Sequence, residues 1–314
     1  MARTGLVWEP RCLLHQPGVG HPECPQRLEA IRNGLEQAGL WQRCEPLAAR
    51  PATDSELLRC HTKPYLKLVS EEIAAGRRTL STGDTSLSPD TEDAARLAAG
   101  GALVAAEAVM DGRLENAFVA VRPPGHHASS DQGMGFCLFN NVALAARHAQ
   151  VALGCDRVLI VDWDVHHGNG TQALFWRDPS VLFFSVHQAP FYPGSGAANE
   201  RGAGPGLGFT INCPLPAGSG GKEVLAALQE HLVPAAEAFR PSLVLLSSGF
   251  DGMAGDPLAH LQLKATDVAD LTLIVKTLAA RTAEGRLVSL LEGGYGLGNL
   301  ARGAAAHVEV LLVG

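Results

Sequence analysis

The sequence predicts an α/β fold, in which one domain has a mostly parallel central sheet with helices on both faces. From about residue 90 onward, short apolar runs alternate with longer segments of helical periodicity. Such alternation is typical of parallel sheets. No Pro/Gly/Ser-rich linker and no shift in composition divides the 314 residues, and 46% of them are hydrophobic. We therefore expect a single domain over residues 1–314.

The predicted elements alternate along the chain. An opening strand near Leu6–Trp8 precedes a mostly helical N-terminal region, with Pro25–Ala38 and Asp54–His61 as its clearest helices. The later strands share short, mostly β-branched or otherwise apolar runs and are expected at Ala117–Val121, Val158–Val161, Val181–Phe184, Phe209–Asn212, Leu243–Leu246 and Leu287–Leu291. The helices share longer periodic patterns and are expected at Pro89–Asp111, Asn140–Leu153, Lys222–Phe239, Ala265–Glu284 and Leu297–Leu312.

The composition argues against several classes of protein. The net charge is -7, and the Lys and Arg residues are scattered singly, which disfavours direct binding to nucleic acid. No run of eighteen apolar residues predicts a membrane span. Seven cysteines without a Cys-x-x-Cys motif disfavour a disulfide framework and a thiolate zinc site. We expect a cytoplasmic protein, and the sequence leaves oligomerisation open.

The most informative segment is a buried strand that runs into Asp-x-Asp-x-His-His-Gly, from Val158 to Gly168. Residues two apart at a strand end point the same way, so we expect Asp162, Asp164 and His166 to converge. Two carboxylates and an imidazole in a low-dielectric environment need a cation to be tolerated. The segment therefore predicts a metal site, and a structural ion-pair cluster is the alternative.

Five apolar runs end in unusual polar clusters. The clusters are Arg122–His127, the Asp/His segment, Ser185–His187, Ser247–Asp251 and Glu292–Tyr295. Ligands of open parallel sheets bind beyond the carboxyl ends of the strands, so we expect these clusters to share one crevice.

Three residues offer a metal two oxygens and one nitrogen, namely Asp164, His166 and Asp251. This set leaves a coordination position open, as in catalytic zinc sites, although Fe(II), Co(II) and Mn(II) also fit it. For Asp251 the alternative is a turn or N-cap aspartate, because glycines surround it.

Other residues of these clusters suit acid–base and binding roles. His126 and His127 are candidate acid/base groups, with Asp162 and Asn169 as their orienting partners, or else they are ordinary loop histidines. The phenol of Tyr295 suits donation to an oxyanion, although Gly-Gly-Tyr also fits a plain turn. Phe136 and Tyr192 lie in glycine-rich loops, where they would form a slot for an unbranched chain or fill the core.

These stretches together resemble the histone deacetylase superfamily, most closely class II deacetylases and their bacterial amidohydrolase relatives. The resemblance covers residues 122 to 295 and a shorter N-terminal segment, His21–Leu28. Its motifs lie at Arg122–His127, Gly133–Asn141, Ile160–Gly170, Ser185–Val186, Phe191–Gly196, Ser247–Gly252 and Leu291–Tyr295.

The resemblance implies an arginase/deacetylase-like fold and a role for each matching residue. It implies zinc ligation by Asp164, His166 and Asp251. The catalytic group it implies contains His126, His127, Asp162, Asn169 and Tyr295, with the second histidine as the acid/base. The substrate would contact the carbonyl of Gly135, the rings of Phe136 and Tyr192, and Leu258. A structural potassium ion is implied at Asp162, Ser185 and Val186, together with the carbonyls of Asp164 and His166. A second monovalent site is implied near Phe175, Asp178 and Val181.

The resemblance also separates the substrate alternatives. A binuclear ureohydrolase needs a late Asp-x-Asp pair, but this chain reads Asp251-Gly252-Met253. Polyamine-selective relatives carry an acidic residue where this chain has Leu258, so we expect acyl-lysine peptides or proteins as substrates and acetylpolyamines as the alternative. A weakly active acyl-lysine reader is disfavoured by Tyr295. At the rim we expect Asp84 to be a solvated turn aspartate rather than a substrate contact.

Overall fold

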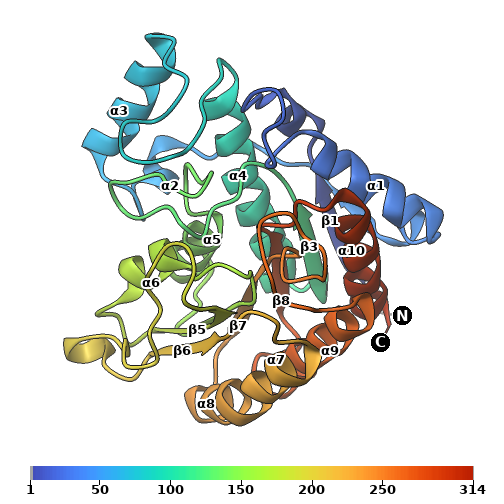
Figure 1. Cartoon of the computed structure of the whole chain (residues 1–314). Helices are drawn as coiled ribbons and strands as arrows, with labels where there is room; N and C mark the ends of the chain where they lie inside the picture. The colour runs from blue at the N-terminus through green and yellow to red at the C-terminus, as the bar shows by residue number, and fades with distance from the viewer. Residues whose placement is uncertain (1–2, 314) are drawn as a thin grey trace.

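The computed structural model describes residues 3–313, so the first and last residues of the predicted domain lie outside the described range. Within that range eight strands form one parallel sheet in the order β2-β1-β3-β8-β7-β4-β5-β6 (Figure 1). The strands are β1 (Thr4–Trp8), β2 (Glu45–Leu47), β3 (Asn116–Ala120), β4 (Val158–Asp162), β5 (Val181–Gln188), β6 (Thr210–Leu215), β7 (Leu243–Ser248) and β8 (Leu287–Leu291). The predicted single-domain α/β fold with a parallel sheet is confirmed.

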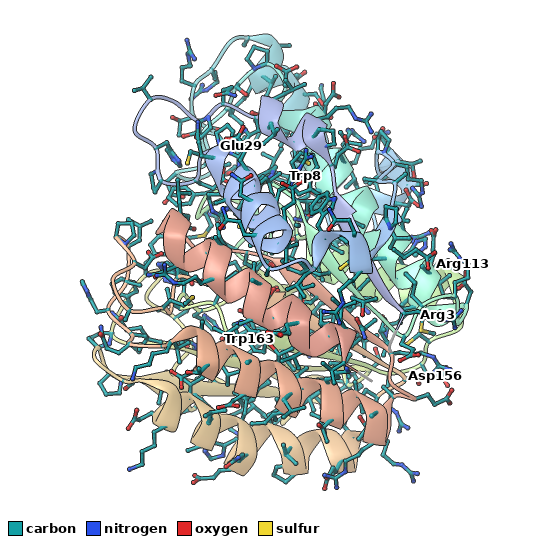
Figure 2. The ribbon with its side chains drawn as sticks, turned by 90° about the vertical axis from the view of Figure 1, so that its right-hand side faces the viewer. Arg3, Trp8, Glu29, Arg113, Asp156 and Trp163 are labelled. Atoms are coloured by element: carbon teal, nitrogen blue, oxygen red, sulfur yellow. The ribbon has the colours of Figure 1, made fainter. Side chains whose placement is uncertain are left out.

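Helices cover both faces of the sheet. The helices are α1 (Gln26–Gln37), α2 (Asp54–Leu57), α3 (Lys63–Ala74), α4 (Thr91–Met110), α5 (Asn141–Ala152), α6 (Asn169–Phe175), α7 (Gly221–Ala227), α8 (Val233–Phe239), α9 (Ala265–Thr282) and α10 (Leu297–Leu312). Helices α4 and α5 pack against each other and against the central strands. On the opposite face α1, α10 and α9 lie side by side, followed by α7 and α8 (Figure 2).

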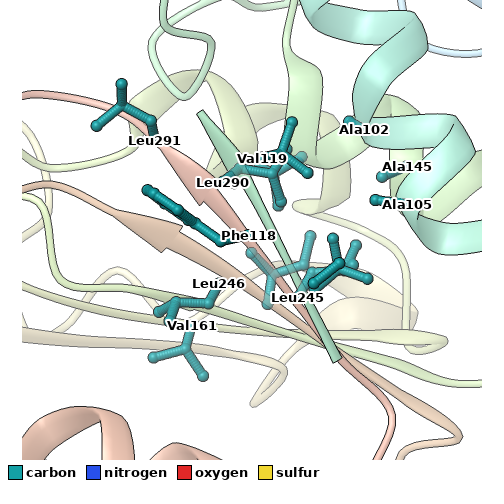
Figure 3. Close-up of a cluster of buried hydrophobic side chains, with 14 of the residues drawn as sticks. Ala102, Ala105, Phe118, Val119, Ala145, Val161, Leu245, Leu246, Leu290 and Leu291 are labelled. Carbon is teal, nitrogen blue, oxygen red and sulfur yellow. The ribbon is translucent and has the colours of Figure 1, made fainter. Parts of the chain in front are cut away.

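The core lies between these layers because successive residues of each strand point to opposite faces. Val119, Leu245 and Leu290 face the small side chains of α4 and α5, among them Ala102 and Ala145 (Figure 3). Phe118, Val161, Leu246 and Leu291 point to the other side (Figure 3). The central strands are buried on both faces, which explains why their sequences are continuous apolar runs without alternation.

The predicted helix Lys222–Phe239 is helical throughout, but it is not one regular α-helix. A single π-helical turn, Leu228–Leu232, separates α7 from α8. Pro234 lies in the first turn of α8 and has no backbone N–H, so the regular i to i−4 bonding cannot pass through it.

Three elements had no predicted range: the short β2 and α6, and the twelve-residue helix α3. Helix α3 carried a usable signal, because the Thr62 hydroxyl accepts a hydrogen bond from Tyr65 N at 3.3 Å and Pro64 occupies the first turn. Strand β2 has only three residues, and a run of that length shows no periodicity. In the described part of the chain no helix is long and apolar enough to cross a membrane.

Candidate active site at the carboxyl ends of the central strands

Five adjacent strands, β3, β8, β7, β4 and β5, deliver the polar clusters to one edge of the sheet. The strands pair in register, so that Asp162 at the end of β4 lies opposite Ser247 of β7 and Ser185 of β5. The parallel order therefore brings together segments that are more than one hundred residues apart in sequence.

Three of the predicted residues form a compact buried group. Ligand atoms of Asp164, His166 and Asp251 all lie within 4.8 Å of one another. The backbone fixes the two carboxylates, since Asp164 Oδ2 accepts from Gly293 N at 2.7 Å and Asp251 Oδ1 accepts from Val165 N at 3.0 Å. The second oxygen of Asp251 is buried and has no hydrogen-bond partner among the described residues.

This arrangement fits a divalent cation. Burial and the neighbouring Asp164 carboxylate raise the pKa of Asp251 to about 6, because an isolated buried anion is unfavourable. The group offers one imidazole nitrogen and carboxylate oxygens, which are the donors of catalytic zinc sites, and the orphan oxygen of Asp251 lies 3.3 Å from His166 Nδ1. A bound cation would give that oxygen a partner and offset the buried negative charge.

Asp162 does not join this group, although the alternation of side chains along a strand predicted that it would converge with Asp164 and His166. Strand β4 ends at Asp162, and the chain then turns, so that Asp164 and His166 no longer follow strand geometry. Asp162 Oδ2 instead contacts His126 Nδ1 at 3.0 Å, and its other oxygen accepts from Asp164 N at 3.1 Å.

The tandem histidines have different partners. His127 Nδ1 lies 2.7 Å from the amide oxygen of Asn169, whereas His126 Nδ1 pairs with the carboxylate of Asp162. Burial alone would lower the pKa of His126, but Asp162 and Asp164 outweigh it and raise that pKa well above its usual value. Burial, reinforced by His126 and His166, lowers the pKa of His127 well below its usual value. The pKa values of the two rings are therefore shifted in opposite directions, although the ring centroids are only 4.0 Å apart.

Tyr295 lies in a turn held from two sides. Asp256 accepts hydrogen bonds from the backbone N–H groups of Tyr295 at 2.8 Å and Gly296 at 3.0 Å. The guanidinium of Arg27 lies 5.0 Å from the centre of the Tyr295 ring and donates to Gly294 O at 2.7 Å. Burial raises the pKa of the Tyr295 phenol well above its usual value, so the hydroxyl keeps its proton.

A cavity of about 230 Å³ leads to this group. Its lining is Asp84, His127, Gly135, Phe136, His166, Phe191, Tyr192, Leu258 and Tyr295. All four predicted substrate contacts, Gly135, Phe136, Tyr192 and Leu258, are among these residues. Sequence reasoning missed Phe191 as a lining residue, although it opens the Phe191–Gly196 motif, and its ring stacks on His166 at 5.3 Å.

The glycine at position 135 is required by a close approach. Gly135 has φ +56°, and a Cβ atom there would lie 2.2 Å from a ring carbon of His127. The next residue, Phe136, also has a left-handed φ of 67°, which turns its ring against Tyr295 at 5.9 Å. Asp84 is exposed, as expected, but it also accepts from Gly135 N at 2.6 Å and thereby holds this loop at the rim.

The residues predicted to hold monovalent ions lie beside this site. The hydroxyl of Ser185 is 2.9 Å from His187 Nδ1 and is next to Asp162 in the sheet, with Val186 following in β5. Near the second predicted site, the carboxylate of Asp178 already pairs with Arg147 at 2.6 Å, and the guanidinium lies 4.6 Å from the centre of the Phe175 ring.

Sequence reasoning missed a buried ionic cluster behind the Tyr295 turn. Glu23 accepts from Arg27 Nη1 at 3.1 Å and from two nitrogens of Arg122 at 2.5 and 2.7 Å, and all three side chains are fully buried. Glu23 and Arg27 come from the His21–Leu28 segment, and Arg122 begins the tandem-histidine motif. That N-terminal segment was singled out as a motif, but no chemistry indicated its contacts.

A model of the histone deacetylase domain matches residues 21–311. The chain belongs to the histone deacetylase family. This confirms the resemblance predicted from the seven motifs between residues 122 and 295. The crystal structure of the HDA15 HD domain superposes with a TM-score of 0.94 at 41% identity, covering 99% of this chain and 90% of that one.

Relatives whose names give different activities are similar to this chain. The histone deacetylase-like amidohydrolase of Pseudomonas aeruginosa is 40% identical over 311 residues, or 93% of this chain and 82% of that protein. The polyamine deacetylase HDAC10 of Mus musculus is 43% identical over 325 residues, or 99% of this chain and 47% of that protein. The chain thus spans about half the length of the mouse relative.

Proposed function

We propose that the chain is a zinc-dependent deacetylase that hydrolyses the amide of acyl-lysine side chains in peptides or proteins and releases acetate. The observation that carries the proposal is the unpartnered oxygen of Asp251, buried beside Asp164 and His166 and next to two histidines with opposite pKa shifts. Family membership supports the reaction class, and the aromatic lining of the cavity by Phe136, Phe191 and Tyr192 supports an unbranched substrate arm.

The metal and the histidines have separate tasks. Zinc held by Asp164, His166 and Asp251 would supply Lewis acidity, which lowers the pKa of bound water to about 7 and polarises a carbonyl. Asn169 Oδ1 accepts from the protonated Nδ1 of His127, which leaves His127 Nε2 free to take a proton from water. The same nitrogen then returns the proton to the leaving amine.

Neighbouring groups support this proton transfer. His126 stays an imidazolium beside Asp162, so it stabilises negative charge and does not compete as a base. The Tyr295 hydroxyl keeps its proton and donates a hydrogen bond to the carbonyl oxygen as negative charge develops there. Phe136 and Tyr192 exclude water from the substrate arm, and Gly135 O accepts the substrate amide N–H. Potassium held at Asp162, Ser185 and Val186 is part of the same proposal.

Acetylpolyamines are the second candidate substrates, because a relative at 43% identity is named a polyamine deacetylase. Leu258 at the cavity wall argues against them, since an apolar side chain gives no attraction to a second ammonium group. A weakly active acyl-lysine binding protein is the third candidate, and the phenol of Tyr295 argues against it.

Acetate release tests the proposal on one panel of substrates. The panel contains an acetyl-lysine peptide, longer acyl-lysine peptides, acetylputrescine and acetylspermidine, each with zinc-loaded enzyme and with chelator. We expect the highest kcat/KM on acetyl-lysine peptide and loss of turnover with chelator. A preference for acetylspermidine would favour the second candidate.

The variant Tyr295→Phe separates an enzyme from a reader, because it removes one hydroxyl and keeps the ring. We expect kcat to fall by roughly 10²-fold, as for loss of one oxyanion donor. Equal, background-level turnover in wild type and variant, with retained peptide binding, would support the reader.

The variant His127→Ala tests the general base separately from the zinc ligands. We expect full zinc content by metal analysis and a loss of about 10²–10⁴-fold in kcat, the usual contribution of a general base. Loss of zinc in this variant would contradict the separation of ligands from the base.

A further inference from the structure

Glu292 is a buried carboxylate that the proposed reaction does not use. It follows the end of β8 and is fully buried. One oxygen, Oε2, accepts from Gly125 N at 2.7 Å and from His126 N at 3.1 Å. The other, Oε1, accepts from the Ser247 hydroxyl at 2.9 Å. The side chain therefore links the ends of β8 and β7 to the turn that carries both histidines.

The two N–H groups belong to consecutive residues directly before His127. The same turn is fixed on its other side, because Thr171 N donates to His126 O at 3.1 Å. A Cβ atom at Gly125 would lie 2.5 Å from Asn141 N, so the backbone is closely packed there as well. Of the contacts that fix this turn, those of Glu292 come from the end of β8, the strand that leads into the Tyr295 turn.

No other described side chain accepts from these two N–H groups. If the carboxylate were removed, both would be buried donors without a partner, which is unfavourable, and the turn would shift to find one. A displacement of about 1 Å at a catalytic group can cost on the order of 10²-fold in rate. The imidazole of His127 is the group that such a shift would move.

We propose that Glu292 is a positioning residue, which holds the tandem-histidine turn in register with the metal ligands and Tyr295 through its hydrogen bonds to Gly125 and His126. This inference rests on the proposed deacetylase function. The required property is an acceptor oxygen at the Oε2 position, and neither proton transfer nor substrate contact by Glu292 is involved.

The test compares three variants on the substrate that wild type turns over best. Glu292→Gln keeps an amide oxygen that can accept from both N–H groups, and its NH₂ group can donate to the Ser247 oxygen. Glu292→Asp keeps the charge but is too short to reach both donors, and Glu292→Ala removes the acceptor. Glu56→Gln is the control. Glu56 is also a buried carboxylate and accepts a hydrogen bond of 2.8 Å from Thr53 N, but it does not line the cavity.

We expect the alanine and aspartate variants to lose about 10²-fold in kcat, with KM within twofold of wild type and full zinc content. The glutamine variant should recover most of kcat, and the Glu56 control should keep wild-type kcat. If the alanine variant does not fold, the order glutamine above aspartate decides.

Wild-type kcat in the aspartate variant, or equal losses in the glutamine and aspartate variants, would overturn the positioning role. A fall in kcat that only follows lost zinc would overturn it as well. Absence of turnover by wild type on the whole panel would instead refute the proposed function itself.

Discussion

Two buried charged regions of this protein differ in how their polar atoms are satisfied. In the cluster of Glu23, Arg27 and Arg122, each guanidinium nitrogen donates to the carboxylate or to a backbone carbonyl such as Cys12 O or Gly294 O. In the cluster of Asp164, His166 and Asp251, one carboxylate oxygen accepts no hydrogen bond from any described residue and lies 3.3 Å from His166 Nδ1.

The pKa values of the central carboxylates in the two regions shift in opposite directions, in agreement with this difference in their partners. Burial alone would raise the pKa of Glu23, but Arg122 outweighs it and holds that pKa well below its usual range. Burial and Asp164 raise the pKa of Asp251 to about 6, and the neighbouring His166 offsets this rise only in part. The first cluster is therefore satisfied by groups of the chain itself, whereas the second leaves a carboxylate oxygen that a cation could bind. Burial of charge alone does not indicate a metal site; the indication here is an unpartnered carboxylate oxygen within 4.8 Å of two further ligand atoms.

The largest effect is expected from Asp251→Asn, which keeps the shape of the side chain and removes its charge. We expect zinc binding to fall below detection and deacetylation to reach background, because one of three ligands is lost. The metal-free variant should be more stable than metal-free wild type by roughly 1–3 kcal/mol, since a buried unpaired anion is gone. Metal analysis and urea unfolding with chelator measure these changes.

Two results would contradict this account of Asp251. Full zinc occupancy in Asp251→Asn would remove Asp251 from the ligand set. A metal-free variant less stable than metal-free wild type would show that the carboxylate is satisfied within the chain.

The opposite sign is expected for Glu23→Gln in the satisfied cluster. Loss of this carboxylate leaves two buried guanidinium groups without their anion, which costs about 3–5 kcal/mol of unfolding free energy. The folded fraction should keep a full complement of zinc, because none of its ligands contacts Glu23. Urea unfolding and metal analysis of the purified variant check both points. If the unfolding free energy of Glu23→Gln stays within about 1 kcal/mol of the wild-type value, the ion pairs add nothing to the stability of the fold.

The sequence predicted the sheet and most of the site because both depend on local pattern. Apolar runs identified the central strands, and the polar residues after Val121, Val161 and Leu291 identified the crevice. Parallel strands necessarily bring such ends together, so His126, His166 and Tyr295 meet without any knowledge of the sheet order.

Contacts between distant segments escaped prediction because no local pattern encodes them. Glu23 contacts Arg122, which is 99 residues away in sequence and follows β3, so no local pattern encodes that ion pair; only its second partner, Arg27, has a local i,i+4 spacing. The direction of Asp162 depends on where β4 ends, and a shift of one residue changes the face to which a side chain points. The π turn before α8 likewise follows from the packing around a proline that sequence periodicity ignored.

A smaller effect of acid is expected from His307, which lies outside both clusters. Burial lowers the pKa of His307 to about 3, and its two ring nitrogens contact Thr272 and Ser289 at 2.8 Å. In the unfolded chain His307 binds a proton near pH 6.5, whereas in the folded protein it stays neutral down to about pH 3. The free energy of unfolding therefore falls as the pH drops from about 6.5 towards 3. Each pH unit in that window should cost up to about 1.4 kcal/mol at this site. Urea unfolding at pH 7 and pH 5 measures the loss, and His307→Gln, which stays neutral, should lose less than wild type. Any effect of zinc release is common to both proteins, so the difference between their losses of unfolding free energy reports on His307 alone. Equal losses in wild type and His307→Gln would show that this histidine does not set the acid sensitivity.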